Sequence, residues 1–320
     1  MSRIVVVTGG MVDAAVVQEM APDGFELLVA RPGSPEWLPA LAGASYLVGF
    51  ADMLVRDELY AAAPGLRLVQ VLSAGYDRAD LGAARRAGVP LANNGGANAV
   101  AVAEHALLLM LAVSRQLIRQ HTNVVAGRWR GNATPRLHEL RGKVLGIIGI
   151  GTIGKKVARL AQAFGMVVHY YDIARLPEDE EDLLNVRFRL FRELLRTSDV
   201  VSLHVPLNER SRHMLSAREL AWLQPTAILI NTSRGQVIDE VALHVALSAG
   251  AFAGAGLDVF DQEPPPADNP LFSLDNVVLT AHMAGPTQES NIARLRNAFD
   301  NVQRVERGEK PLWVVPELLP

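Results

Sequence analysis

Short apolar runs alternate along the chain with longer stretches in which apolar residues recur every three or four positions. Runs of this length predict buried β-strands, and the three- and four-residue spacing predicts helices. Alternating strands and helices are typical of a parallel sheet covered on both faces. The first hundred residues therefore predict a complete α/β unit, with strands at 4–7, 26–30, 46–50, 66–72 and 89–92 and helices at 11–20, 57–63 and 80–87.

The stretch 144–172 combines two strand-like runs, at 144–148 and 167–171, with a glycine-rich turn and a helical pattern between them. Gly149, Gly151 and Gly154 have the GxGxxG spacing, which permits a tight turn, a close approach to a pyrophosphate, and close packing of helix on strand. The helix N-terminus would offer free N–H groups to the phosphates. Asp172 ends the second run, where a carboxylate can accept hydrogen bonds from ribose hydroxyls. A glycine-rich turn alone is found in many α/β proteins, but this complete order predicts a dinucleotide-binding unit.

The rest of the chain predicts a second α/β unit around this turn, with later strands at 200–204, 227–231, 254–259 and 277–280. The segment 99–126 predicts one long helix, buried nearly all round over its first half, that connects two domains or lies at their interface. A final helical pattern at 287–307 is expected to return to the first unit. The acidic segment 178–182 is interpreted as a solvated surface turn. We therefore expect a discontinuous substrate (catalytic) domain, residues 1–98 and 289–320, and a dinucleotide-binding domain, residues 99–288.

With 320 residues the chain is long enough for two domains, and its net charge of −3 gives no electrostatic reason to bind nucleic acid or an anionic membrane. Cysteine is absent, which excludes disulfides, thiolate catalysis and cysteine metal sites. The longest uninterrupted apolar run, 106–113, is too short to span a membrane. We therefore expect a cytoplasmic protein with no nucleic-acid or membrane partner. No cluster of ligand-type residues predicts a metal site.

Three strand ends of the second unit carry side chains that could orient a substrate and transfer a proton beside a nicotinamide. Arg234 follows one strand, and its guanidinium suits a carboxylate and a neighbouring carbonyl oxygen. Glu263 lies beside a proline run that would hold it in place. His282 follows another strand and is the natural proton donor near neutral pH, above all with a carboxylate beside its ring. Taken singly, these residues could also be a surface ion pair, an exposed acid and a structural histidine.

Together these segments resemble the D-isomer-specific 2-hydroxyacid dehydrogenases over almost the whole chain. The matching segments are SAGYD (73–77), NAVAVAEHALLLMLA (98–112), GKVLGIIGIGTIG (142–154), HVPLNERSRHML (204–215), INTSRGQVIDE (230–240), GLDVFDQEP (256–264) and TAHMAGPT (280–287). The resemblance implies an α/β fold of two doubly wound parallel-sheet domains, with a flavodoxin-like substrate domain, a Rossmann NAD-binding domain and the active site in the cleft between them. It also implies a homodimer formed through the helix 99–126, in which His105 would be structural.

The resemblance implies a role for each candidate residue. Arg234 would bind the substrate carboxylate and carbonyl, and His282 would be the acid/base, paired with Glu263. The backbone of Ser73, Ala74 and Gly75 would bind the substrate carboxylate. The cofactor would contact Gly149, Gly151, Thr152, Ile153 and Gly154 at the pyrophosphate, Asp172 at the ribose, Pro206 at the adenosine, and Thr232 and Asp258 at the nicotinamide.

The implied reaction transfers a hydride from NADH to C2 of a small 2-oxo acid while His282 protonates the oxygen, and the reverse oxidises a D-2-hydroxy acid. NAD is favoured over NADP because Asp172 would repel a ribose 2′-phosphate, although Arg175 leaves NADP open. Ala281 and Met283 depart from residues common in the family, which would alter the loop or the pocket wall.

The substrate stays open among glyoxylate, hydroxypyruvate and pyruvate, because pocket size is expected to depend on residues 50–54, Tyr76 and Met283. Two other functions also stay open. One is a non-catalytic, NAD(H)-sensing scaffold like the transcriptional corepressors that share this fold. The other is a formate or phosphite dehydrogenase on the same fold, although formate enzymes carry extra segments that this sequence lacks.

Overall fold

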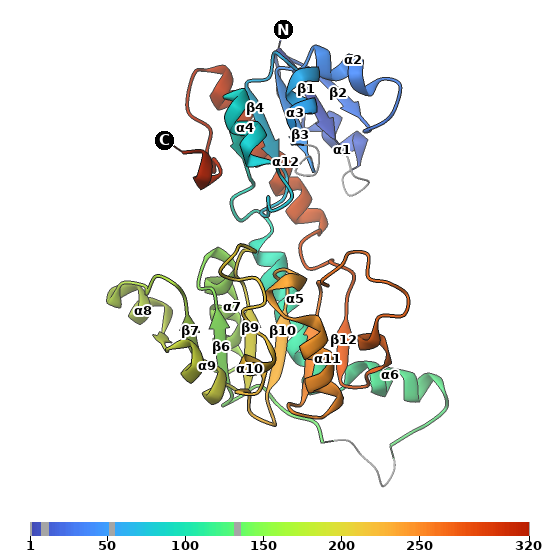
Figure 1. Cartoon of the computed structure of the whole chain (residues 1–320), viewed down its shortest axis with the longest axis vertical. Helices are drawn as coiled ribbons and strands as arrows, with labels where there is room; N and C mark the ends of the chain where they lie inside the picture. Colours follow the sequence, from blue (N-terminus) through green and yellow to red (C-terminus); the bar gives the residue numbers. More distant parts are fainter. Residues whose placement is uncertain (1, 8–12, 51–54, 131–135, 320) are drawn as a thin grey trace. The chain divides into compact units, whose positions relative to one another are not determined.

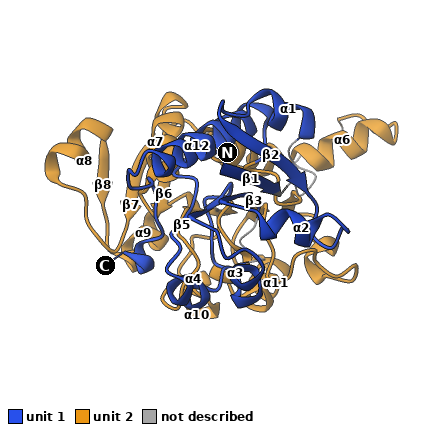
Figure 2. Ribbon diagram, turned by 90° about the horizontal axis from the view of Figure 1, so that it is seen from above, with its two compact units in different colours: residues 1–98, 286–320 blue, residues 99–285 orange. Residues whose placement is uncertain are grey.

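The computed structural model describes residues 2–7, 13–50, 55–130 and 136–319. The chain forms two compact units: unit 1 is residues 1–98 with 286–320, and unit 2 is residues 99–285. Figure 2 colours them blue and orange. The start of the predicted helix at 11–20 and the predicted pocket residues 51–54 lie outside the described residues.

Unit 1 is built around a parallel sheet, which among the described residues has five strands in the order β2-β1-β3-β4-β5. Its strands are β1 (Ser2–Val7), β2 (Phe25–Ala30), β3 (Tyr46–Gly49), β4 (Leu68–Val71) and β5 (Leu91–Ala92). Its helices are α1 (Ala14–Glu19), α2 (Trp37–Ala42), α3 (Asp57–Ala62), α4 (Leu81–Ala87) and α12 (Gln288–Glu306), with a short 3₁₀ helix at Pro316–Leu318.

The apolar side chains of β1 point alternately to the two faces of the sheet, which explains why both faces are covered. Ile4 and Val6 belong to the same apolar cluster as Phe299 of α12. Val5 lies between them in sequence and packs in the opposite cluster, with Leu59 of α3. Successive side chains of a strand point to opposite faces, so a run without polar residues needs helices on both sides.

Unit 2 has a second parallel sheet, whose described strands number seven in the order β12-β11-β10-β9-β6-β7-β8. They are β6 (Val144–Ile148), β7 (Val167–Tyr171), β8 (Val186–Phe188), β9 (Val200–Leu203), β10 (Ile228–Asn231), β11 (Gly254–Leu257) and β12 (Val277–Leu279). The helices are α5 (Ala99–Ser114), α6 (Leu117–Val125), α7 (Thr152–Ala163), α8 (Glu178–Leu184), α9 (Phe191–Thr197), α10 (Ala217–Leu220) and α11 (Glu240–Ser248), with 3₁₀ helices at Gly235–Val237 and Pro270–Ser273.

The two faces of this sheet carry separate cores. Ile147 of β6 clusters with Leu109 of α5 and Ala158 of α7. The next residue, Ile148, clusters with Leu194 of α9 and other residues of the opposite face. Figure 1 shows α9, α10 and α11 in front of the sheet and α5 and α7 behind it. The prediction of two parallel-sheet α/β domains is confirmed.

The prediction of one long helix over 99–126 is wrong. The helix ends at Ser114, α6 begins at Leu117, and the two helices meet at an angle of 62°. Gln116 between them has φ 47°, a left-handed conformation that a continuous α-helix does not contain. Among the described residues, no single helix is long and apolar enough to cross a membrane, and only this bent pair reaches the required length and composition together.

The interpretation of 178–182 as a surface turn is also wrong. These residues begin α8, and Glu181 is only 2% exposed because Arg175 and Tyr170 bind its carboxylate. An acid can be buried in a packed helix when neighbouring groups donate hydrogen bonds to its carboxylate. The run of acidic residues alone gave no sign of these donors and therefore indicated full solvation.

Candidate active site

The glycine-rich turn between β6 and α7 is so tight that two of its glycines admit no side chain. Gly149 has φ 95°, and a Cβ added there would lie 2.6 Å from the carbonyl oxygen of His204. A Cβ added at Gly154 would lie 2.2 Å from the carbonyl oxygen of Gly149. A Cβ at Gly151, the N-cap residue of α7, would instead point into open space. The turn therefore leaves room for a ligand at the helix N-terminus, where free N–H groups favour phosphate.

Asp172 follows β7 and lies beside this turn. Its Oδ2 accepts a hydrogen bond of 2.9 Å from the backbone N–H of Ile150, so the turn itself holds the carboxylate. A hollow of about 530 Å³ is lined here by Gly151, Thr152, Asp172 and the basic residues Lys155, Lys156 and Arg159. A helix N-terminus and a carboxylate share this hollow, so these residues fit an adenine dinucleotide. Ile153 packs against the core and has only its backbone to offer.

Acids of α8 hold two basic residues of this dinucleotide unit. Arg175 donates to both oxygens of Glu181, at 2.8 and 2.9 Å, and Lys155 donates to Glu180 at 2.7 Å. Glu181 also accepts a hydrogen bond of 2.7 Å from the Tyr170 hydroxyl. The hydrogen bonds from Arg175 are the main cause that lowers the pKa of the Glu181 carboxyl to about 2. The acid is therefore charged at neutral pH and keeps Arg175 against α8.

Arg234 follows β10, in a loop held by Asn231. The Asn231 Nδ2 donates a hydrogen bond of 2.9 Å to the carbonyl oxygen of Arg234. Gly235 comes next, and a Cβ added there would lie 1.9 Å from backbone atoms of Phe260. Only glycine permits this approach, which brings the Arg234 loop against the segment that leads into Glu263.

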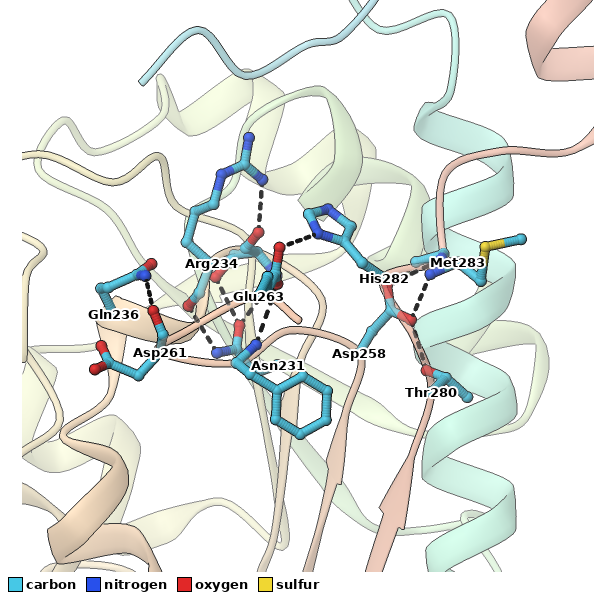
Figure 3. A network of polar contacts seen from close by, with 12 residues as sticks. Asn231, Arg234, Gln236, Asp258, Asp261, Glu263, Thr280, His282 and Met283 are labelled. Carbon is cyan, nitrogen blue, oxygen red and sulfur yellow. Dashed lines mark hydrogen bonds and ion pairs between the residues drawn. The ribbon is translucent and has the colours of Figure 1, made fainter. Parts of the chain in front are cut away.

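The ring of His282 is paired with Glu263. Its Nδ1 lies 2.8 Å from Glu263 Oε2, and Oε1 accepts a hydrogen bond of 3.2 Å from the N–H of Phe260. An ionised carboxylate can only accept, so Nδ1 carries the hydrogen and Nε2 is left for another partner. The His282 side chain is 47% exposed and that of Glu263 is 19% exposed. Figure 3 shows the Arg234 guanidinium and the imidazole on the same side of the Glu263 carboxylate.

Asp258 follows β11 and holds the loop of His282. It is completely buried, and its two carboxylate oxygens accept hydrogen bonds of 2.8 and 2.9 Å from the N–H groups of Met283 and Ala284. Its carbonyl oxygen accepts a third, at 2.8 Å, from the N–H of His282. These bonds stabilise His282 at φ 53°, a left-handed conformation uncommon for a residue with a side chain. The carboxylate thus positions the loop, while its contact with the nicotinamide stays a prediction.

Thr232 and Pro206 lie beyond the ends of β10 and β9. Thr232 is buried, and among the described residues its hydroxyl has no hydrogen-bond partner. Buried hydroxyls normally have one, so this orphan fits a contact with a bound ligand. Pro206 accepts a hydrogen bond of 2.6 Å from the Ser211 hydroxyl at its carbonyl oxygen. The cofactor roles of both residues stay predictions.

In unit 1, the loop after β4 presents backbone N–H groups. Each carbonyl oxygen of Ser73, Ala74 and Gly75 accepts a hydrogen bond from a nearby residue. They accept hydrogen bonds of 3.0 Å from the N–H of Asn94, 2.8 Å from Asn93 Nδ2 and 2.7 Å from Ser73 Oγ, respectively. Within the described residues, the three N–H groups donate to no acceptor. A row of fixed N–H donors suits a carboxylate, as predicted for this loop.

Sequence reasoning missed the residues that hold these loops. Asn231 is the last residue of β10, and Asn93 directly follows β5. An asparagine at a strand end is the one sequence signal that could have identified them. His105 was expected to be structural in a buried helix, yet its Nε2 lies 2.9 Å from Thr280 Oγ1, beside the His282 loop.

Known proteins match both the sequence and the fold. Residues 107–284 match the family model of the D-isomer specific 2-hydroxyacid dehydrogenase NAD-binding domain. A glyoxylate reductase of Korarchaeum cryptofilum is 42% identical over 285 residues, which cover 88% of this chain and 86% of that protein. The crystal structure of a glyoxylate reductase from Paecilomyes thermophila covers 99% of both chains, with a TM-score of 0.87 and 32% identity.

A D-lactate dehydrogenase from Aquifex aeolicus, solved with NAD and lactic acid, has a TM-score of 0.82 and 29% identity over 95% of this chain and 96% of its own. The match extends through both units, and the dinucleotide turn stands in the middle of the chain, after a complete α/β unit. The chain therefore belongs to the D-isomer specific 2-hydroxyacid dehydrogenases, as its motifs indicated.

Proposed function

We propose that the protein reduces a small 2-oxo acid to a D-2-hydroxy acid with NADH, and catalyses the reverse oxidation, with His282 as the acid/base. The observation that carries the proposal is the contact of 2.8 Å between His282 Nδ1 and Glu263 Oε2. Arg234 lies on the same side of that carboxylate. A paired imidazole and a guanidinium suit the reduction of a carbonyl that stands next to a carboxylate.

Proton transfer falls to His282. The bound nicotinamide supplies the hydride that adds to C2 of the substrate. His282 donates its Nε2 proton to the carbonyl oxygen, so the product gains one C–H and one O–H bond. Glu263 accepts from Nδ1, which orients Nε2 and stabilises the ring while it is protonated. In the reverse direction the neutral Nε2 takes the hydroxyl proton.

Substrate binding falls to Arg234 and to backbone N–H groups. The fork of the guanidinium suits one carboxylate oxygen and the neighbouring carbonyl oxygen, whose polarisation favours attack by hydride. The N–H groups of Ser73, Ala74 and Gly75 are further proposed donors to the substrate carboxylate. Glyoxylate and similarly small 2-oxo acids are the proposed substrates, and the relatives named glyoxylate reductases support this choice.

NAD is the proposed cofactor in preference to NADP. The N–H of Ile150 holds the carboxylate of Asp172 beside the turn. If this carboxylate binds the ribose as proposed, it would repel a 2′-phosphate. Arg175 could have offset this repulsion, but Glu181 holds it with two hydrogen bonds. Lys155 donates a single hydrogen bond of 2.7 Å to Glu180.

The test is NADH oxidation with glyoxylate, hydroxypyruvate and pyruvate, by the wild-type chain and by His282→Ala. We expect the substitution to lower kcat by roughly 10²–10⁴-fold, the contribution of one general acid, while NADH binding measured by fluorescence stays unchanged. A kcat within tenfold of wild type would remove His282 from the chemistry.

The same assay distinguishes the other two functions. A wild-type chain that binds NADH tightly but turns over no 2-oxo acid would favour the non-catalytic scaffold. Turnover of formate or phosphite alone would favour the third function.

A homodimer through α5 and α6 is also proposed, in a protein expected to be cytoplasmic. Figures 1 and 2 show α6 extending away from the rest of unit 2. Its apolar residues Leu117, Ile118 and Val125 are 48%, 54% and 73% exposed. An exposed apolar helix face is typical of an interface with a partner. Light scattering after gel filtration should give twice the chain mass, and Ile118→Glu should give a monomer; a monomeric wild type would contradict the proposal.

A further inference from the structure

The ring of His105 lies on the side of α5 that faces the end of β12. Its Nε2 is 2.9 Å from Thr280 Oγ1 and 3.5 Å from Asp258 Oδ1. The side chain is 14% exposed, and that of Asp258 is fully buried. A histidine in a buried apolar helix is thus placed against the residue that holds the His282 loop.

The direction of these hydrogen bonds follows from the donors available. The Thr280 hydroxyl has a single hydrogen and donates it to Asp258 Oδ1 at 2.6 Å. Its oxygen can therefore only accept from His105, so Nε2 of that ring carries a hydrogen. A one-way relay runs from His105 through Thr280 to the buried carboxylate.

Asp258 in turn binds three successive N–H groups of the loop, those of His282, Met283 and Ala284. Figure 3 shows the contacts of Asp258 with Met283 and with the Thr280 hydroxyl. Within the described residues, His105 is the only basic side chain within 4 Å of the Asp258 carboxylate. A buried acid needs its donors to stay in one place, because a lost donor is costly inside a protein.

We propose that His105 is a positioning residue for the reaction, which acts through Thr280 and Asp258 to keep His282 in its left-handed conformation. The inference rests on the proposed function, since it assigns His105 to the loop of the proton donor. It replaces the expectation that His105 is merely part of the helix packing.

The test compares His105→Leu, which removes the donor, with His105→Gln, whose amide N–H can take the place of Nε2. We expect His105→Leu to lower kcat roughly tenfold, the usual size of one buried hydrogen bond, with the KM for the 2-oxo acid within twofold of wild type. His105→Gln should recover most of the turnover. Thr280→Val should lower kcat at least as much as His105→Leu, because it also removes the direct hydrogen bond to Asp258. The double variant should lose no more than Thr280→Val alone, because both substitutions break the same relay.

A second measurement does not depend on turnover. Amide hydrogen exchange over 280–285 should be at least several-fold faster in His105→Leu than in wild type, because Asp258 would hold Met283 and Ala284 less firmly. Asp179→Asn, at an exposed acid of α8 in the same unit, is the control and should change neither quantity. Unchanged exchange in this segment, or a lower melting temperature with wild-type kcat, would overturn the positioning role. A wild-type chain without turnover would instead overturn the proposed function, and the exchange result would still decide the role of His105.

Discussion

Arg175 donates two hydrogen bonds, of 2.8 and 2.9 Å, to the carboxylate of Glu181 in α8. Arg175 stands only three residues after Asp172 in the sequence. The cation that stands closest in sequence to Asp172 is thus already bound within the protein. Discrimination against a 2′-phosphate would then have two sources, repulsion by Asp172 and the absence of an uncommitted Arg175.

Releasing Arg175 should therefore shift cofactor use toward NADPH. Glu181→Gln removes the charge that holds the guanidinium but keeps an acceptor for the Tyr170 hydroxyl. We expect the ratio of kcat/KM for NADPH to that for NADH to rise roughly tenfold, the effect of one charge-assisted hydrogen bond. The control is Asp182→Asn, on the same helix, which breaks an exposed pair with Arg187 of β8. An unchanged ratio in Glu181→Gln would show that Asp172 alone sets the preference.

The same pair makes stability depend on pH in the acid range. The pKa of Glu181 falls from its ordinary 4.5 to about 2 in the folded protein. Its contribution is therefore fully present above about pH 4.5 and is lost as the pH falls toward 2. Urea unfolding should show wild type more stable than Glu181→Gln at pH 7, with a smaller difference at pH 3. A difference that stays constant between these two pH values would refute this account.

The loop of Ser73 should depend on Asn93, which holds the Ala74 carbonyl oxygen at 2.8 Å. Asn93→Ala frees this carbonyl, so the N–H groups of the loop lose their fixed direction. We expect KM for the 2-oxo acid to rise roughly tenfold with kcat changed less, since the lost bond serves binding rather than proton transfer. Steady-state kinetics would detect this rise in KM. The control is Glu58→Gln, at an exposed acid of α3. A pure loss of kcat would argue against a binding role for the loop.

Arg294 is a buried cation whose removal should not destabilise unit 1. It is 5% exposed, and its contacts are a hydrogen bond of 3.1 Å to Asn291 and the ring of Phe50. No ion pair joins it to any residue described, and burial lowers its pKa to about 10. Arg294→Met keeps most of the apolar stem and removes the desolvated charge. We expect equal or higher stability, by up to about 2 kcal/mol in urea unfolding.

Arg296→Met, two positions along the same helix and exposed, should change stability by less than about 0.5 kcal/mol. If Arg294→Met lost more than about 2 kcal/mol, the guanidinium would have to make stabilising contacts beyond these two.

Much of the fold was predictable because its strands are short apolar runs. For β6 and β7 the predicted limits, 144–148 and 167–171, agree with the observed ones, because each apolar run is followed by a residue that interrupts it, Gly149 or Asp172. The break between α5 and α6 was not predictable. No glycine or proline stands there, and Gln116 adopts a left-handed conformation that its residue type does not indicate. The helical acids of α8 were misread because the partner of Glu181 lies six residues away, outside any helical spacing.

The site could be predicted only in part, for a similar reason. Arg234, Glu263 and His282 stand at strand ends or in loops and could be identified by residue type and family motif. The contact of His282 with Glu263 joins residues 19 positions apart, and that of His105 with Thr280 joins residues 175 apart. Contacts of that kind depend on sheet register and helix packing, which a pattern of apolar residues does not specify.

The register of β11 and β12 allows the connection between these two strands to change in length. These strands pair directly, with Leu257 opposite Leu279, so Asp258 and Thr280 follow at matching heights. The loop of His282 is thus anchored to the sheet rather than to the segment 260–276 that joins the two strands. An insertion at the exposed Ser273 or Asp275, beyond Glu263, should leave turnover intact. That segment is where this enzyme could accept a fused domain or a reporter without moving the imidazole of His282.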